Sequence, residues 1–185
     1  MKSRVATKSK ERASPRKAMA WHASHLGRSA ADGNAFQRRM QRIRAMTHAG
    51  CAVCGATGCH GLHVCFHAWP DGRVTGVFEG RPDLQGYPNT LHGGMVSTLL
   101  DAAMTNCLFA HGFAAVTAEL TVRFLRPVAA DRPVTAGAWI EKSWRRLHFL
   151  AAELRQEGEL MATATAKFIV HRPRSAMPSP ATCRD

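Results

Sequence analysis

Hydrophobic residues recur every three or four positions along residues 91–112, which predicts a long helix. A helix that is apolar almost all round is a buried helix. We therefore expect it to begin at Gly93 and Gly94 and to run through the middle of the domain. Its few polar positions form a narrow stripe of Ser97, Thr98, Asp101 and Thr105.

Alternation of apolar and polar residues predicts strands on both sides of this helix. Residues 61–69 and 73–79 form a hairpin around a Pro-Asp-Gly turn, and residues 80–90 are expected to be a loop. Further strands are predicted at residues 115–125, 134–142, 145–156 and 159–171. This order predicts an α+β fold, in which an antiparallel sheet wraps around one long central helix.

The strong positive charge belongs to the N-terminal segment. The formal net charge is +12, and residues 1–50 carry twelve Lys and Arg against Glu11 and Asp32. We expect residues 1–49 to be a basic, disordered arm, in which a short helix around residues 35–46 can form. Residues 50–171 are then the folded domain and residues 172–185 a disordered tail.

Several readings of the arm stay open. A basic arm can touch nucleic acid or an anionic membrane, but without a recognition-helix pattern we do not expect nucleic-acid contact. An organelle transit peptide, or translation from Met19, Met40 or Met46, would explain the same composition. No apolar run approaches the roughly 20 residues of a membrane span. Six cysteines without a secretory signal indicate a cytoplasmic protein.

A cysteine- and histidine-rich segment precedes the first strand. Cys51 and Cys54 have the spacing of a zinc knuckle. The following candidates are Cys59, His60, His63, Cys65 and His67. They lack the separation of a dozen or more residues that usually precedes a second ligand pair, and the last three alternate along a strand. We therefore expect no metal and no cofactor, and interpret CAVCG as a tight turn into the first strand.

The helix itself carries two groups that suit acyl chemistry. The first amides, at Gly93 and Gly94, have no intrahelical partner and lie at the positive helix end, where they can bind a polarised carbonyl oxygen. Asp101 is a carboxylate on a buried helix, which is costly unless it is partnered or used. It is either a catalytic carboxylate or a structural acid bonded to threonine hydroxyls.

The spacing of these groups predicts a dimer. Gly94 and Asp101 are seven residues apart, so about 10 Å of helix axis separates them. Catalytic groups must come within about 3 Å of the reacting centre. Two antiparallel copies of the helix can meet this requirement, one giving the amides and the other the carboxylate. We expect a homodimer, or a pair of such dimers.

Residues 85–104 read QGYPNTLHGGMVSTLLDAAM, which resembles the pattern QGxPxxxHGGxxxxxxD of hotdog-fold thioesterases of the PaaI-like family. The resemblance continues through TAELTVRFLRPV and ATATAKFIV, and it covers residues 50–171. It implies the hotdog fold and hydrolysis of acyl-CoA thioesters to a free acid and CoA.

The resemblance also implies roles for individual residues. The Gly93 and Gly94 amides would polarise the thioester carbonyl, and Asp101 of the partner subunit would act as general base or nucleophile. Thr117 matches a position that orients the water. His92 would shape the loop and contact the acyl or pantetheine carbonyl.

Other residues are candidates for substrate binding. Gly86 stands where many relatives carry an Asn. The Asn side chain, which would help to position the substrate, is therefore missing in this chain. Thr98 lies one turn before Asp101 and can restrain its rotamer. Arg123 and Arg126 are candidates for the CoA phosphates, because Arg favours phosphate oxygens. Cys107 lies on the apolar helix face and is expected to be a core thiol.

Two other functions compete with hydrolysis. An acyl-CoA-sensing regulator would hold the ligand while the basic arm binds DNA, but it has no use for a hydrolytic base such as Asp101. A hotdog dehydratase or hydratase would use a His and a carboxylate in a different spacing.

Overall fold

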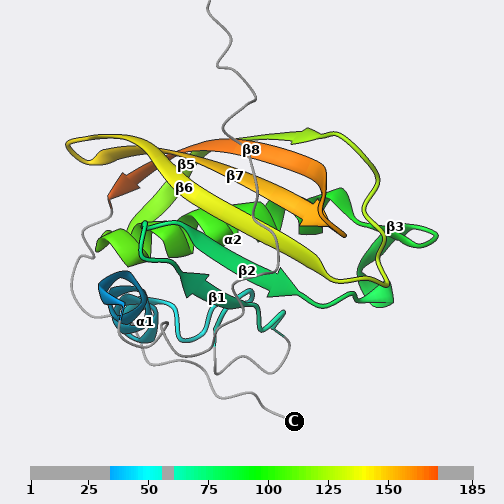
Figure 1. Cartoon of the computed structure of the whole chain (residues 1–185), viewed down its shortest axis with the longest axis horizontal. Helices are drawn as coiled ribbons and strands as arrows, with labels where there is room; N and C mark the ends of the chain where they lie inside the picture. Colours follow the sequence, from blue (N-terminus) through cyan, green and yellow to red (C-terminus); the bar gives the residue numbers. More distant parts are fainter. Residues whose placement is uncertain (1–33, 56–60, 171–185) are drawn as a thin grey trace, which may run out of the picture.

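The computed structural model describes residues 34–55 and 61–170 (Figure 1). The predicted disordered tail and most of the basic arm lie outside these residues. The helices are α1 (Ala35–Thr47) and α2 (Gly93–His111), with a 3-10 turn η2 (Pro82–Leu84). The strands are β1 (Cys65–Ala68), β2 (Val74–Phe78), β3 (Gln85–Tyr87), β4 (Thr90–Leu91), β5 (Ala115–Phe124), β6 (Val134–Trp144), β7 (Leu147–Gln156) and β8 (Glu159–Val170).

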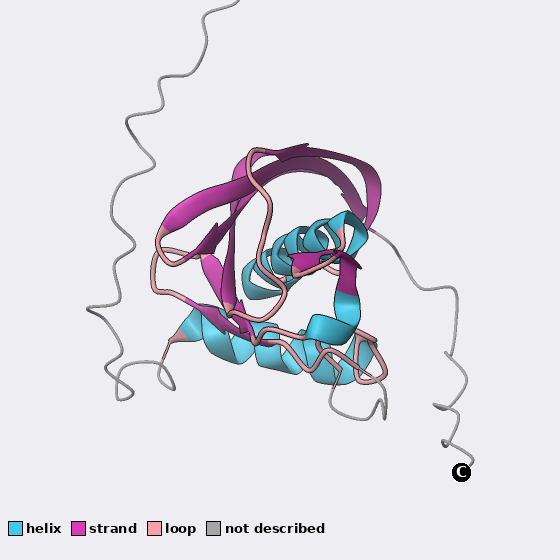
Figure 2. Ribbon diagram, turned by 90° about the vertical axis from the view of Figure 1, so that its right-hand side faces the viewer, coloured by secondary structure: helices cyan, strands magenta, loops and turns pink. Residues whose placement is uncertain are grey.

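The predicted α+β architecture is confirmed. Six antiparallel strands form one sheet in the order β1-β2-β6-β7-β8-β5. The sheet curves around α2, and α1 lies on the opposite side of that helix (Figure 2). Its inner face and α2 share one hydrophobic core, because alternate strand residues point toward the helix. Among the described helices, none combines the length and apolar character that a bilayer span requires.

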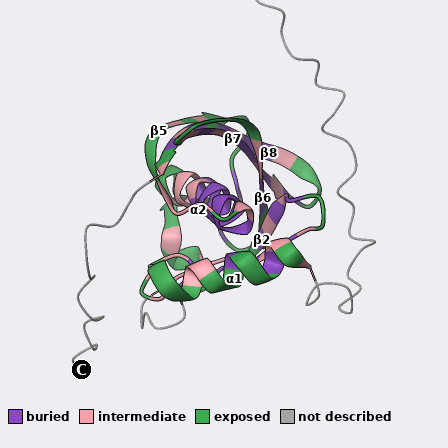
Figure 3. Cartoon of the chain, turned by 90° about the vertical axis from the view of Figure 1, so that its left-hand side faces the viewer, coloured by how far each residue is buried: buried purple, intermediate pink, exposed green. Residues whose placement is uncertain are grey.

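The central helix begins and ends as the sequence predicts. It starts at Gly93, and Gly112 follows its last residue in the left-handed conformation (φ 93°). Twelve of its nineteen residues are buried, and several have no exposed surface. The buried face is visible along α2 in Figure 3. Ser97, Thr98 and Asp101 of the predicted polar stripe are only half-buried, so these polar side chains keep some contact with solvent.

The N-terminal helix corrects the expected domain boundary. The possible short helix is observed at Ala35–Thr47, but it packs on α2 and belongs to the folded domain. Met40 is fully buried against the core, and the Gln37 side chain accepts a hydrogen bond from the Ala68 amide at 2.7 Å. Arg39 donates to the Ala110 carbonyl at the end of α2. The described fold therefore starts at Asn34, not at residue 50.

Two segments differ in detail from the expected strands and loops. The first strand is shorter than predicted, because His63 has φ 50° and residues 62 and 64 donate to the Ala52 and Val53 carbonyls. The expected loop over residues 80–90 contains the small hairpin of β3 and β4. This hairpin packs directly before α2 and holds the residues that precede the helix.

Candidate active site

Asp101 and Thr117 meet between the central helix and the edge strand β5. The Thr117 hydroxyl donates to Asp101 Oδ1 at 2.6 Å. Beside this contact the pairing of β5 with β8 shifts by one residue, between Thr117 and Glu119. Such a β-bulge re-aims side chains, and bulges are common next to active sites. The sequence predicts both residues as site residues, and the structure brings them together.

The Asp101 carboxylate lies in a cavity of about 280 Å³. Burial raises the pKa of this carboxyl above its ordinary value, while the Thr117 hydrogen bond and the nearby His48 act in the opposite direction. A carboxyl whose pKa is raised toward working pH is a better proton acceptor. The cavity is lined by His48, Cys51, Val53, Cys54, Ser97, Thr98, Asp101, Ala102, Thr105, Asn106 and Leu120.

The start of the central helix forms the second part of the site. His92 caps the helix, and its Nδ1 accepts a hydrogen bond from the Gly94 amide at 2.9 Å. The accepting nitrogen carries no proton, so the imidazole is held as the Nε2–H tautomer when it is neutral. Within the described residues the Gly93 amide donates to no group. Gly93, rather than Gly94, is therefore the amide that is free to bind an oxygen.

Gly86 supports this helix start through its small size. A Cβ at this position would lie 3.1 Å from Cδ2 of the His92 ring. The absence of a side chain therefore lets the β3 backbone approach the capping histidine closely. Sequence reasoning noted only the Asn that many relatives carry here.

A second cavity, of about 450 Å³, opens at this helix start. His92 and Gly93 line it together with Gly86 and Arg126, and Asp101 is not among its lining residues. The two predicted catalytic features of one chain thus face different cavities. This agrees with the axial separation of about 10 Å along the helix.

The remaining predicted residues lie partly in the cavities, partly at the surface and partly in the core. Thr98 lines the Asp101 cavity, but its hydroxyl donates to the Gly94 carbonyl at 2.8 Å and does not hold Asp101. Arg126 pairs with the exposed Glu159, whereas Arg123 is exposed on β5. Cys107 is fully buried, and burial raises the pKa of its thiol to about 12, as expected for a core thiol.

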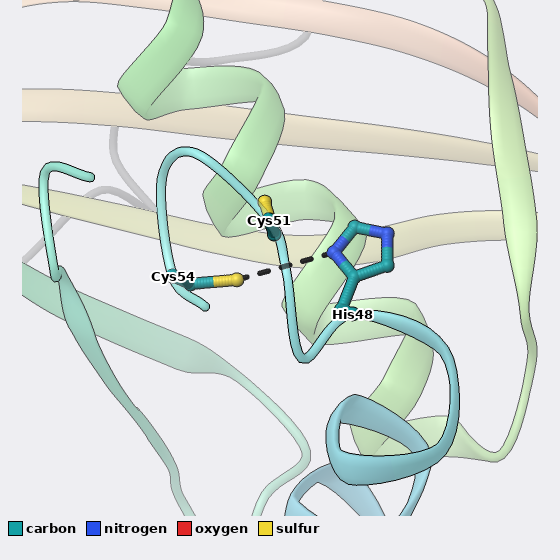
Figure 4. Close-up of side chains that lie close together, drawn as sticks. All are labelled: His48, Cys51 and Cys54. Atoms are coloured by element: carbon teal, nitrogen blue, oxygen red, sulfur yellow. Dashed lines mark hydrogen bonds between the residues drawn. The ribbon is translucent and has the colours of Figure 1, made fainter. Parts of the chain in front are cut away.

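Sequence reasoning missed His48. The donor atoms of His48, Cys51 and Cys54 all lie within 4.8 Å of one another, and all three residues line the Asp101 cavity. Figure 4 shows the His48 ring and the Cys54 thiol pointing toward each other across the loop. A signal for it exists in the sequence, because His48 stands three residues before Cys51 and repeats the spacing of the cysteine pair.

Part of the chain is similar to known thioesterases. The model of the thioesterase superfamily matches residues 88–163. The chain is 34% identical over 116 residues to acyl-coenzyme A thioesterase THEM4 of Bos taurus, covering 62% of this chain and 48% of the relative. The THEM4 protein of Mus musculus is 29% identical over 107 residues, covering 57% and 46%. This chain thus spans about half the length of these relatives.

Solved structures share the architecture. A mutant of the phenylacetic acid degradation protein PaaI from Thermus thermophilus is 28% identical, with a TM-score of 0.55 over 60% of this chain and 95% of that one. The E. coli PaaI protein is 20% identical, with a TM-score of 0.63 over 75% and 94% of the two chains, and shows the fold alone. The chain is thus similar to proteins of the thioesterase superfamily over residues 88–163, and its described residues share the fold of these solved structures.

Proposed function

We propose that this protein is an acyl-CoA thioesterase that hydrolyses its substrate to a free acid and CoA. The observation that carries the proposal is Asp101: a half-buried carboxylate on the central helix, held by the Thr117 hydroxyl at the wall of a cavity. The THEM4 relatives, which bear the name acyl-coenzyme A thioesterase, support the reaction class.

Hydrolysis of a thioester needs an activated water and a donor for the developing oxyanion. Asp101 takes the proton of the water, or attacks the carbonyl itself, and Thr117 keeps the carboxylate in one orientation. The Gly93 amide, at the positive end of α2, stabilises the oxyanion. His92 holds the neighbouring Gly94 amide and so fixes the first turn of the helix.

The catalytic unit is a dimer in this proposal, since one chain's Asp101 and helix start line different cavities. The edge strand β5 supports a partner surface. Its Val116 and Phe124 side chains are 53% and 55% exposed, and Tyr87 in the neighbouring hairpin is 78% exposed. Apolar side chains on an open sheet edge favour pairing with a second copy.

The test is a thiol-release assay of the full chain against a panel of acyl-CoAs, with Asp101→Ala as the variant. We expect wild-type turnover on at least one acyl-CoA and a loss of about 10²–10⁴-fold in the variant. Light scattering should give a dimer or a larger even assembly for both proteins. An Asp101→Ala protein with wild-type turnover contradicts the assignment.

A mixing experiment tests whether two subunits share each site. Asp101→Asn removes the base, and Gly93→Pro removes the free amide. In a mixed dimer one site then carries both changes and the other carries neither. Unfolding and refolding an equimolar mixture should recover about a quarter of the wild-type activity if sites are shared. Sites built within one subunit would recover none.

A further inference from the structure

We infer that His48, Cys51 and Cys54 form a zinc-binding site at the wall of the Asp101 cavity. His48 Nδ1 and Cys54 Sγ are 4.0 Å apart, and the three donor atoms lie within 4.8 Å of one another. Bonds of about 2.0–2.3 Å in a tetrahedron place two zinc ligands about 3.6–3.8 Å apart. Small side-chain rotations close the remaining difference.

The loop that carries the cysteines has a geometry suited to thiolate ligands. The Val53 amide donates to Cys51 Sγ at 3.4 Å, and the Asn106 side chain donates to Cys54 Sγ at 3.6 Å. Such N–H donors hold sulfur ligands in place and serve as their outer hydrogen-bond partners when a metal binds. The predicted tight turn is confirmed here, since the Gly55 amide donates to the Cys51 carbonyl at 2.8 Å.

Gly55 makes this turn possible. A Cβ at that position would lie 2.5 Å from backbone atoms of Ala49 and Cys51, so the chain admits only glycine after the second cysteine. In Figure 4 the Cys54 thiol points toward the His48 ring, and the Cys51 sulfur lies within 4.8 Å of both donor atoms. The His48 ring is itself packed edge-on against Phe109 of α2, with ring centroids 4.9 Å apart.

Charge and burial also fit a metal ion. Cys54 is 4% exposed, while His48 and Cys51 are half-buried and leave a path for the ion. The neutral imidazole is the form of histidine that ligates metals. A Zn²⁺ ion with two thiolates and one neutral imidazole has no net charge, so the site buries no uncompensated charge.

An orphaned acceptor belongs to a residue that contacts the cluster. Asn106 is 1% exposed and lines the same cavity, and its Oδ1 has no hydrogen-bond partner within the described residues. Its amide nitrogen already donates to Cys54 Sγ and to the Ala102 carbonyl. A water on the fourth position of the metal is a donor of the kind that this oxygen lacks. Three protein ligands with one open position is the pattern of zinc sites that bind further ligands.

This proposal differs from the expectation of no metal, which considered only candidate ligands that follow the two cysteines. The zinc-knuckle pattern requires a second ligand pair downstream of the cysteines, whereas the third ligand lies upstream, at the end of α1. The proposal does not depend on the thioesterase activity, and its test measures metal and thiols instead.

The test begins with the reduced full chain, loaded with zinc and dialysed against metal-free buffer. We expect about one zinc ion per chain by mass spectrometry of metals, and strong thiolate-to-metal absorption when Co²⁺ replaces it. Cys51→Ser and His48→Gln should lose most of the bound metal. Cys65→Ser, which removes an exposed cysteine outside the cluster, should retain it. Equal zinc in Cys51→Ser and the wild type would overturn the site.

A second measurement does not require the variants to fold. Zinc should protect the half-buried Cys51 of the wild-type chain from N-ethylmaleimide, as mapped by peptide mass spectrometry, and a chelator should remove the protection. Cys65 should react equally under both conditions. Zinc at about 100 times its Kd should raise the Tm by roughly 5–10 °C. A reduced chain that binds no zinc, or that binds it with the Cys51 thiol still reactive, contradicts the proposal.

Discussion

The hydroxyl of Thr117 donates to the carboxylate of Asp101 across 2.6 Å, joining the middle of the central helix to the edge strand. The two residues are sixteen positions apart, so the contact depends on how β5 returns along α2. A hydroxyl that donates to a carboxylate stabilises its charged form. The same contact therefore orients the proposed base and limits the rise in its pKa.

Thr117→Val should slow the reaction and change its pH dependence. The variant keeps the shape of the side chain but removes the donor, so the pKa of Asp101 should rise further. We expect a loss of roughly tenfold to a hundredfold in kcat/KM at neutral pH. The acidic limb of the pH profile should move to higher pH. Thr117→Ser keeps the hydroxyl and should restore both properties, and a Val variant with an unchanged profile would exclude this positioning role.

Asp101→Asn should stabilise the folded protein at neutral pH. Because burial raises the pKa of Asp101, ionised Asp101 costs folding free energy once the pH rises through that pKa. Asn cannot ionise and still accepts the Thr117 hydrogen bond. The gain in Tm should therefore be present at neutral pH and vanish below the ordinary carboxyl pKa of about 4. Thermal unfolding between pH 3 and 8 measures it, and Glu141→Gln at the surface is the control.

Gly93→Pro should reduce activity without weakening the fold. Proline suits the first position of a helix, and His92 before it (φ −57°, ψ 133°) lies outside the helical region that a following proline disfavours. The change removes the Gly93 N–H, and we expect a loss of about 10²–10³-fold in kcat/KM. Gly93→Ala keeps the N–H, and its Cβ would meet Phe124 at an ordinary 3.5 Å. If both variants lose activity equally, the amide is not the oxyanion donor.

Periodicity and spacing predicted much of the fold. The buried helix and the six sheet strands follow from local pattern, because a 19-residue apolar helix among strands with alternating apolar residues is buried economically by a sheet that curves around it. The position of α1 could not be predicted in this way. Its basic residues are typical of a solvated arm, whereas the fully buried Met40 and the hydrogen bonds of Gln37 and Arg39 hold it against the domain.

The candidate site was predictable only in part. Asp101 is recognisable in the sequence as a lone acid on an apolar helix. The helix start is recognisable as a pair of glycines. The use of His92 as acceptor for the Gly94 amide depends on a side-chain rotamer that spacing does not determine. His48 joins Cys51 and Cys54 because the chain turns back at the end of α1, which is a property of the packed structure.

Met40→Ala tests whether α1 is part of the folded domain. Met40 is fully buried between α1 and the core, and truncating a buried Met typically costs about 2–5 kcal/mol. We expect a clear fall in Tm, measured by circular dichroism on the full chain. Met46→Ala on the same helix is the matched control, since Met46 is 73% exposed and its loss should leave the Tm nearly unchanged.

A deletion series sharpens the same point, because residues 1–33 precede α1 and residues 1–47 include it. The shorter deletion should unfold at the wild-type temperature, whereas the longer one should uncover α2 and the Asp101 cavity and aggregate or unfold at lower temperature. If Met40→Ala and the longer deletion both kept the wild-type Tm, α1 would contribute nothing to the fold. The zinc-binding end of that helix would then have no fixed position beside Asp101.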